Sequence, residues 1–145
     1  MIDLDNQTTL NIHLTLLEKI GNSLSTKEIE LVIVDESTMQ ELNHQYRNKN
    51  YITDVLSFPI EKSFKEEPIN SIPLGTIVIC ASLVEKEAQN FSHTIQDELS
   101  LLFIHGLLHL LGFDHETDNG EMRQKEKVLI ELFNLPKSLI IRTQE

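Results

Sequence analysis

Residues 99–115 read LSLLFIHGLLHLLGFDH, and this stretch decides how the rest of the chain is interpreted. Its apolar residues predict a helix that ends at Gly112. A helix of about 15 residues rises about 22 Å, which is short of the roughly 30 Å of a bilayer core. We therefore expect the central buried helix of a globular domain and no membrane span.

Three histidines and a glycine in this stretch have the spacing of a metal site. His105 and His109 are four residues apart, so both imidazoles project from one face of a helix. His115 would lie about 80° away around the axis if the helix continued. Gly112 can adopt a left-handed conformation, end the helix and turn the chain back. The sequence therefore predicts that three imidazoles converge on one metal ion.

Three histidines form the ligand set of a catalytic zinc site, because the fourth position stays open to water. A single histidine in an apolar helix is ordinarily a core residue with satisfied hydrogen bonds. Two rings at this spacing, followed by a glycine and a third ring, favour a metal instead. Such sites also accept nickel, copper or iron, so the sequence leaves the identity of the metal open.

The spacing also matches the metzincin protease signature H-E-x-x-H-x-x-G-x-x-H, with one departure. Gly106 stands where these proteases carry the glutamate that takes a proton from water, which disfavours peptide hydrolysis. Asp114 can act as a base or orient a ligand histidine, and it can equally be a turn residue. A metalloprotease is one alternative function.

Length, charge and cysteine content narrow the class of protein. The 145 residues fit one domain, residues 1–145, and the net charge of −11 excludes binding of nucleic acid by bulk charge alone. The single cysteine, Cys80, excludes a disulfide framework and is expected to be buried. The N-terminus lacks the pattern of a signal peptide, so we expect a cytoplasmic protein.

Apolar periodicity and turn signals predict four strands and about five helices. Alternating strands and helices indicate parallel pairing, and two consecutive strands indicate an antiparallel pair. We therefore expect an α+β fold, a small mixed sheet covered by helices, with a metzincin-like zinc helix. A polar segment at 61–71 predicts a mobile loop. The strands are expected at 1–8, 29–34, 53–60 and 75–80, and the helices at 10–21, from 35 or 37, at 82–90, at 94–112 and from 118.

Finer expectations concern caps, helix faces and the other histidines. Capping-box patterns begin two helices, Ser82 with Glu85 and Thr94 with Asp97. The inner side of the last helix is expected to carry Met122, Leu129, Leu132 and Phe133. The remaining histidines are expected at the surface or in a turn: His13, His44 and His93.

Several blocks of sequence stand in the order typical of one known family. They are LNHQYR at 42–47, TDVLSFP at 53–59, LGTIVI at 74–79, HGLLHLLGFDH at 105–115, and Met122, Glu126 and Leu129. With these blocks the chain resembles the YbeY family of bacterial endoribonucleases. Thr76 departs from the pattern, because the family usually has an aspartate there.

The resemblance implies a zinc-dependent endoribonuclease specific for single-stranded RNA, which acts in 16S rRNA 3′-end maturation and in ribosome quality control. It implies zinc on the three histidines and a functional role for Arg47. The implied partners are single-stranded regions of 16S precursor rRNA, proteins of the small ribosomal subunit and an assembly GTPase. A non-catalytic, zinc-containing ribosome-assembly factor is the second alternative.

Arg47 also has a physical interpretation of its own. A guanidinium group binds two phosphate oxygens at once and stabilises charge that grows during phosphoryl chemistry. Residues 44–65 contain four basic and two acidic residues, which predicts a modest positive strip beside the metal. Without the family resemblance, a surface arginine at a helix end is the simpler interpretation.

Overall fold

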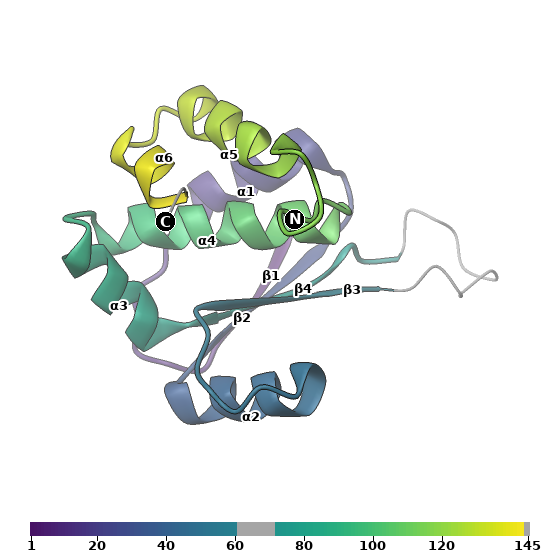
Figure 1. Cartoon of the computed structure of the whole chain (residues 1–145), viewed down its shortest axis with the longest axis vertical. Helices are drawn as coiled ribbons and strands as arrows, with labels where there is room; N and C mark the ends of the chain where they lie inside the picture. Colours follow the sequence, from purple (N-terminus) through teal and green to yellow (C-terminus); the bar gives the residue numbers. More distant parts are fainter. Residues whose placement is uncertain (61–71, 144–145) are drawn as a thin grey trace.

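The computed structural model of the chain describes residues 1–60 and 72–143, and the side chains as far as residue 140. The loop expected at 61–71 lies outside the described residues. A four-stranded sheet lies between two layers of helices, with one helix on one face and the others gathered on the opposite face (Figure 1).

The sheet has the strand order β1-β2-β4-β3. Strands β1 (Ile2–Asn6), β2 (Ile29–Val34) and β4 (Gly75–Cys80) are parallel, and β3 (Val55–Pro59) is antiparallel to β4 at one edge. The predicted mixed sheet is confirmed. The parallel pairing of β1, β2 and β4 is possible because helices connect these strands across the sheet. Strand β3 pairs antiparallel with β4 because no helix lies between them in the described chain.

Helix α2 covers one face of the sheet, and α4 lies across the other with α1, α5 and α6 packed beside it (Figure 1). The described residues form six helices, one more than the expected five, and the additional one is a short C-terminal helix. The six helices are α1 (Leu14–Leu24), α2 (Glu36–Arg47), α3 (Ala81–Asn90), α4 (Ile95–Leu110), α5 (Glu121–Leu132) and α6 (Ser138–Thr143).

Because both faces of the sheet are covered, successive side chains of β4 enter different cores. Ile77 and Ile79 belong to the large core beneath α4. Val78 and Cys80 belong to a smaller core beneath α2, so Cys80 is buried as predicted. In the register of the sheet, Ile77 lies between Leu31 of β2 and Ser57 of β3.

Helix α4 begins and ends as the sequence predicts. The Thr94 hydroxyl accepts a hydrogen bond from the backbone nitrogen of Asp97 at 3.0 Å. At the other end, Gly112 has φ 101°, a left-handed conformation that suits glycine. The Phe113 nitrogen then donates to the Leu108 carbonyl at 3.0 Å, which closes the turn.

Gly106 marks a close approach of α4 to the sheet. A Cβ atom there would lie 2.8 Å from Ile77 Cγ2 and 3.2 Å from Ser57 Oγ. The Ser57 hydroxyl donates to the Gly106 carbonyl at 3.1 Å, which joins the helix to β3. No larger side chain fits at this position unless the helix or the sheet moves.

Three predicted element ends are wrong for local packing reasons. Helix α1 continues past Gly21, which is buried and lies against Ile29 and Phe103. Helix α3 begins at Ala81 with Cys80 at its N-cap and no side-chain cap, so Ser82 lies inside the first turn, where its hydroxyl donates to Glu36 Oε1 at 2.7 Å. Helix α5 begins at Glu121 and not at 118.

Two further predictions, for Leu132 and for His93, are wrong. Leu132 is 66% exposed, because six residues at 100° each place it about 120° from the buried Glu126 on α5. His93 is no simple turn residue, since its side chain is 2% exposed. Its Nδ1 lies 3.4 Å from Glu98 Oε2 and its Nε2 lies 2.7 Å from Ser138 Oγ, which links α6 to α4.

None of the helices in the described parts of the chain has the length and apolar character needed to cross a membrane.

We expect Gly106→Ala to lower the free energy of unfolding by about 1–3 kcal/mol, because the added methyl group overpacks the contact with Ile77. This cost outweighs the roughly 1 kcal/mol that alanine gains over glycine in helix propensity. Urea unfolding measures the change. The control Gln124→Ala, on the exposed side of α5, should change it by less than about 0.5 kcal/mol. An unaltered midpoint for Gly106→Ala would contradict the close packing.

Candidate metal centre

The structure brings the three predicted histidines together. The ring centroids of His105 and His109 are 4.7 Å apart, and that of His115 lies 5.1 Å and 5.3 Å from them. One face of α4 supplies the first two rings, and the turn after Gly112 supplies the third. Their candidate ligand atoms lie within 4.8 Å of one another, so the group can hold a metal ion.

Hydrogen bonds at Nδ1 fix the orientation of two of the rings. His105 Nδ1 donates to Glu126 Oε1 at 2.9 Å, and His109 Nδ1 donates to the Phe113 carbonyl at 3.0 Å. Carboxylate and carbonyl oxygens only accept hydrogen bonds, so these partners assign the proton to each Nδ1. Each Nε2 is therefore left with a lone pair, which is the usual state of a histidine metal ligand.

The donor atoms present fit a metal ion. The Nε2 atoms of His105 and His109 are 3.2 Å apart, and two ligands at about 2.0–2.1 Å from a tetrahedral zinc ion lie about 3.3 Å apart. Facing lone pairs at this distance repel unless a proton or a cation lies between them. His115 Nδ1 is buried and, within the described chain, has no hydrogen-bond partner. A cation in this space satisfies these nitrogens together.

The surroundings of His109 favour its neutral, metal-binding form. Burial lowers its pKa below the usual 6.5, and charge on His105 and His115 lowers the pKa further. The hydrogen bond to the Phe113 carbonyl and the carboxylate of Asp114 act in the opposite direction and are weaker. His109 therefore stays neutral to a lower pH than an exposed histidine.

Glu126 is the carboxylate that contacts one of the three histidines, and the sequence analysis gave it no role. It lies on the inner face of α5 and is only 2% exposed. A buried acid among apolar neighbours such as Met122 and Leu129 needs a partner, which is the signal that could have identified it. Its partner, His105, lies 21 residues earlier in the chain.

The hydrogen bonds of Asp114 are those of a turn residue. The side chain is exposed, and Oδ1 accepts from the Glu116 backbone nitrogen at 3.0 Å. Its carbonyl accepts from the Asp118 nitrogen at 3.0 Å, and this turn carries His115 back towards α4. The carboxylate still lies near enough to influence the pKa of His109.

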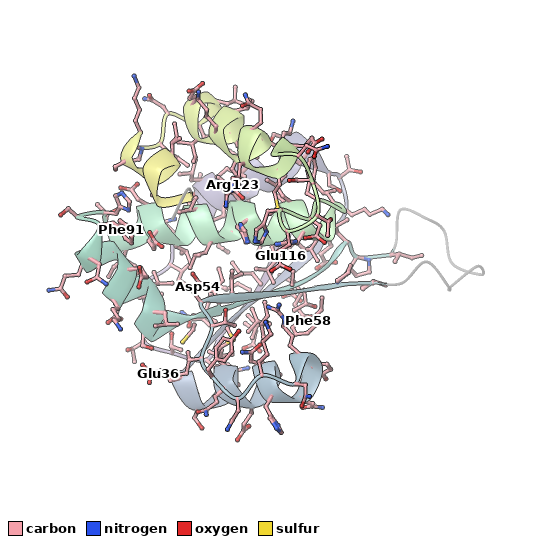
Figure 2. The ribbon with its side chains drawn as sticks, in the orientation of Figure 1. Glu36, Asp54, Phe58, Phe91, Glu116 and Arg123 are labelled. Carbon is pink, nitrogen blue, oxygen red and sulfur yellow. The ribbon has the colours of Figure 1, made fainter. Side chains whose placement is uncertain are left out.

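A cavity of about 560 Å³ opens beside the three histidines. Arg47, the last residue of α2, is exposed and lines it, so the structure places the predicted arginine next to the predicted ligands. Figure 2 shows Asp54 on the β3 side of this space and Glu116 on the α4 side. The remaining lining comes from Tyr46 in the last turn of α2, from Lys49, Tyr51 and Thr53 in the segment that follows, and from β3.

Thr76 lies on the opposite face of the sheet. It lines a groove beneath α2 together with Val78 and Phe58, whereas its neighbour Ile77 faces α4. A carboxylate at this position would therefore be separated from the histidines by the sheet itself. Of the other candidates, His13 and His44 are exposed and Met122 is fully buried, as expected.

We expect Glu126→Gln to weaken zinc binding about 10-fold, which is at the lower end of the effect of removing a hydrogen-bond partner of a metal-binding histidine. The effect is small because the amide oxygen can still accept the hydrogen bond from His105, although it carries no charge. Competition with a chromogenic chelator measures the affinity. The matched control is Glu131→Gln, on the exposed side of the same helix, which should bind zinc as the wild type does. Equal affinities for the two variants would contradict a role for Glu126.

The metal-free protein should lose stability as the pH falls below about 6.5. In the unfolded chain His109 takes up a proton at its usual pKa of 6.5, whereas in the folded protein it does so only at a lower pH. The stability that neutral His109 contributes is therefore complete above pH 6.5 and is lost as the pH falls through the lowered pKa of the folded state. Urea unfolding of chelator-treated protein between about pH 5 and pH 8 measures the slope. His109→Gln should reduce the slope of the free energy of unfolding against pH, and His13→Gln should leave that slope unchanged. Equal slopes in the two variants would argue against His109 as the cause.

Comparisons with known proteins add the family. The sequence profile of the family described as Endoribonuclease YbeY matches residues 2–134. A Sulfurovum protein of that name is 62% identical over 142 residues, which cover 98% of this chain and 97% of the relative. A Helicobacter pylori protein of that name is 53% identical over 146 residues, covering 100% and 99%.

A solved structure is similar as well. The solution structure of a Thermotoga maritima protein matches with a TM-score of 0.62 and 30% identity, covering 92% of this chain and 89% of that one. The profile match and these relatives confirm the resemblance stated from the sequence blocks. The chain belongs to the YbeY endoribonuclease family.

Proposed function

We propose that this chain is a zinc-dependent endoribonuclease specific for single-stranded RNA, which acts in the 3′-end maturation of 16S rRNA and in ribosome quality control. A single domain, residues 1–145, carries the activity. The observation that supports this function best is one cavity lined by both the three-histidine group and Arg47. The names of the relatives supply the reaction, since they are endoribonucleases.

His105, His109 and His115 would hold the zinc ion. Bound zinc supplies a Lewis acid and lowers the pKa of water for attack on a phosphodiester. Glu126 and the Phe113 carbonyl hold the first two rings in the ligand orientation from outside. Their role is to keep both Nε2 atoms directed at one point before any ion or substrate arrives.

Arg47 would bind the scissile phosphate. No described residue forms a hydrogen bond or ion pair with its guanidinium group, which leaves its donors available to a ligand. A fork of donors on two phosphate oxygens stabilises the charge that develops as the bond to the leaving oxygen breaks. We assign Asp114 a supporting role, because its charge acts on His109 and its turn carries His115 back towards α4.

The packing at Gly106 disfavours a metalloprotease. The glutamate of those enzymes would stand at this position, and even its Cβ would lie 2.8 Å from Ile77 Cγ2. The alternative of a non-catalytic assembly factor makes a different prediction, namely a folded and metal-loaded protein without nuclease activity.

The charge of the chain suits a protein that partners deliver to its substrate. A net charge of −11 opposes binding of RNA by bulk electrostatics. We therefore propose that small-subunit ribosomal proteins and an assembly GTPase position the enzyme on 16S precursor rRNA in the cytoplasm. Local cations at the cavity, Arg47 and Lys49, would then make the contacts to phosphate.

We expect Arg47→Glu to reduce cleavage of 16S precursor rRNA by about 100-fold or more while bound zinc is unchanged, because a phosphate contact is lost and the ligands remain. His109→Ala should lose zinc and cleavage together. A gel assay with the zinc-loaded proteins, paired with metal analysis, measures both quantities.

The control is Lys137→Ala, a change to an exposed cation that does not line the cavity. Normal cleavage by Arg47→Glu would exclude the role given to Arg47. Zinc-loaded wild-type protein that cleaves no RNA would favour the assembly factor, and chelator-sensitive digestion of a peptide library would favour the protease.

A further inference from the structure

The cavity beside the histidines contains both tyrosines of the chain, Tyr46 and Tyr51. They are 59% and 54% exposed. In the part of the chain that the structure describes, no phenylalanine is exposed. Large exposed aromatic rings cost free energy in water, so the presence of both at this cavity needs an explanation, although Tyr46 also borders the groove beneath α2.

Tyr51 is exposed although its backbone is held in place. The side chain of Asn43, fully buried in α2, donates from Nδ2 to the Tyr51 carbonyl at 2.8 Å. The Lys49 nitrogen donates to the Asn43 carbonyl at 3.3 Å. One buried residue therefore fixes the segment on both sides of Asn50, and the Tyr51 ring extends from an anchored backbone.

Tyr46 is supported from one side only. Its ring meets Phe58 of β3 edge to face, with centroids 5.1 Å apart and planes at 65°. Figure 2 shows Phe58 on the side of β3 that faces α2, and β3 is an edge strand, so this contact lies on the α2 face at the edge of the sheet. The contact holds the Tyr46 ring in position while more than half of the residue's surface stays exposed to solvent, where it borders both the cavity and the groove beneath α2.

Two cations accompany these rings. Lys49 Nζ lies 5.8 Å from the centre of the Tyr51 ring, and Arg47 directly follows Tyr46 in the chain. Two cations that lie in the chain between two aromatic rings suit a ligand that combines phosphates with flat bases, which is a nucleic acid strand. The bases must be unpaired and unstacked to offer their faces, as they are in single-stranded RNA.

We propose that Tyr51, together with Tyr46, forms a base-stacking subsite for the nucleotides that flank the scissile phosphate, with Lys49 on a neighbouring phosphate. This inference rests on the proposed endoribonuclease function and explains a preference for unpaired RNA at that site. Tyr51 and Tyr46 are positioning residues, because they bind bases and not the reacting phosphate.

The absence of tryptophan from the chain provides a direct test. Zinc-loaded Tyr51→Trp carries a single indole, whose emission should be quenched on rapid mixing with a short single-stranded RNA. The same RNA with abasic residues beside the cleavage position should quench it far less, and an RNA duplex should leave the emission unchanged. Quenching by the abasic strand equal to that by the intact strand would overturn the subsite.

Cleavage kinetics give a second readout. Tyr51→Ala should raise KM about 10-fold with kcat nearly unchanged, because one stacked base is lost and the chemistry is not touched. Tyr51→Phe should restore the wild-type KM, since the ring remains. Lys49→Ala should raise KM and weaken its dependence on salt, whereas the matched control Lys137→Ala should not. Circular dichroism and zinc content confirm that each variant is folded.

The two readouts separate this inference from the proposed function. If wild-type protein cleaves RNA while Tyr51→Ala keeps its KM and the indole of Tyr51→Trp is not quenched, the subsite is overturned and the function stands. If no RNA is cleaved but single-stranded RNA alone quenches the indole, the subsite stands and the proposed function fails.

Discussion

Two imidazole nitrogens, His105 Nε2 and His109 Nε2, face each other at 3.2 Å, and each carries a lone pair. The lone pairs point inward because Glu126 and the Phe113 carbonyl accept the protons on the far sides of the rings. Alone this geometry is repulsive, and around a cation it becomes favourable. The turn that follows α4 adds the third ring and also carries the carbonyl that orients the second, so one backbone reversal serves two ligands.

The sheet separates α4, which carries two of the histidines, from α2, which carries Arg47, and residues from both helices meet at the edge strand β3. Helix α4 lies on one face with the histidines, and its close contact at Gly106 sets their height above β3. Helix α2 lies on the other face, yet it ends beside the same edge strand. Arg47 and the segment that follows α2 therefore line the cavity together with β3. Figure 1 shows α2 and α4 on opposite sides of the sheet. The site is assembled where elements from both faces meet.

Local geometry explains which parts of this arrangement could be predicted from the sequence. The spacing of His105 and His109, the conformation of Gly112 and the alternation of strands with helices depend on neighbours within about ten residues. The contact of Glu126 with His105 and that of Ser82 with Glu36 depend on how distant elements pack. The sequence therefore drew attention to Asp114, because it lies next to His115 in the chain. The carboxylate that contacts a histidine is instead that of Glu126, from α5.

The bond between Glu126 and His105 joins α5 to the candidate metal centre, so binding of an ion there would be linked in free energy to the docking of this helix. Whatever loosens α5 from α4 lowers the affinity for the ion, and loss of the ion removes part of what holds α5 in place. Substitutions that loosen the packing of α5 against α4 would thus lower metal occupancy without touching a histidine. A cell starved of the metal would hold this chain with α5 and α6 less firmly docked and more open to proteolysis, so metal supply would govern its lifetime as well as its chemistry.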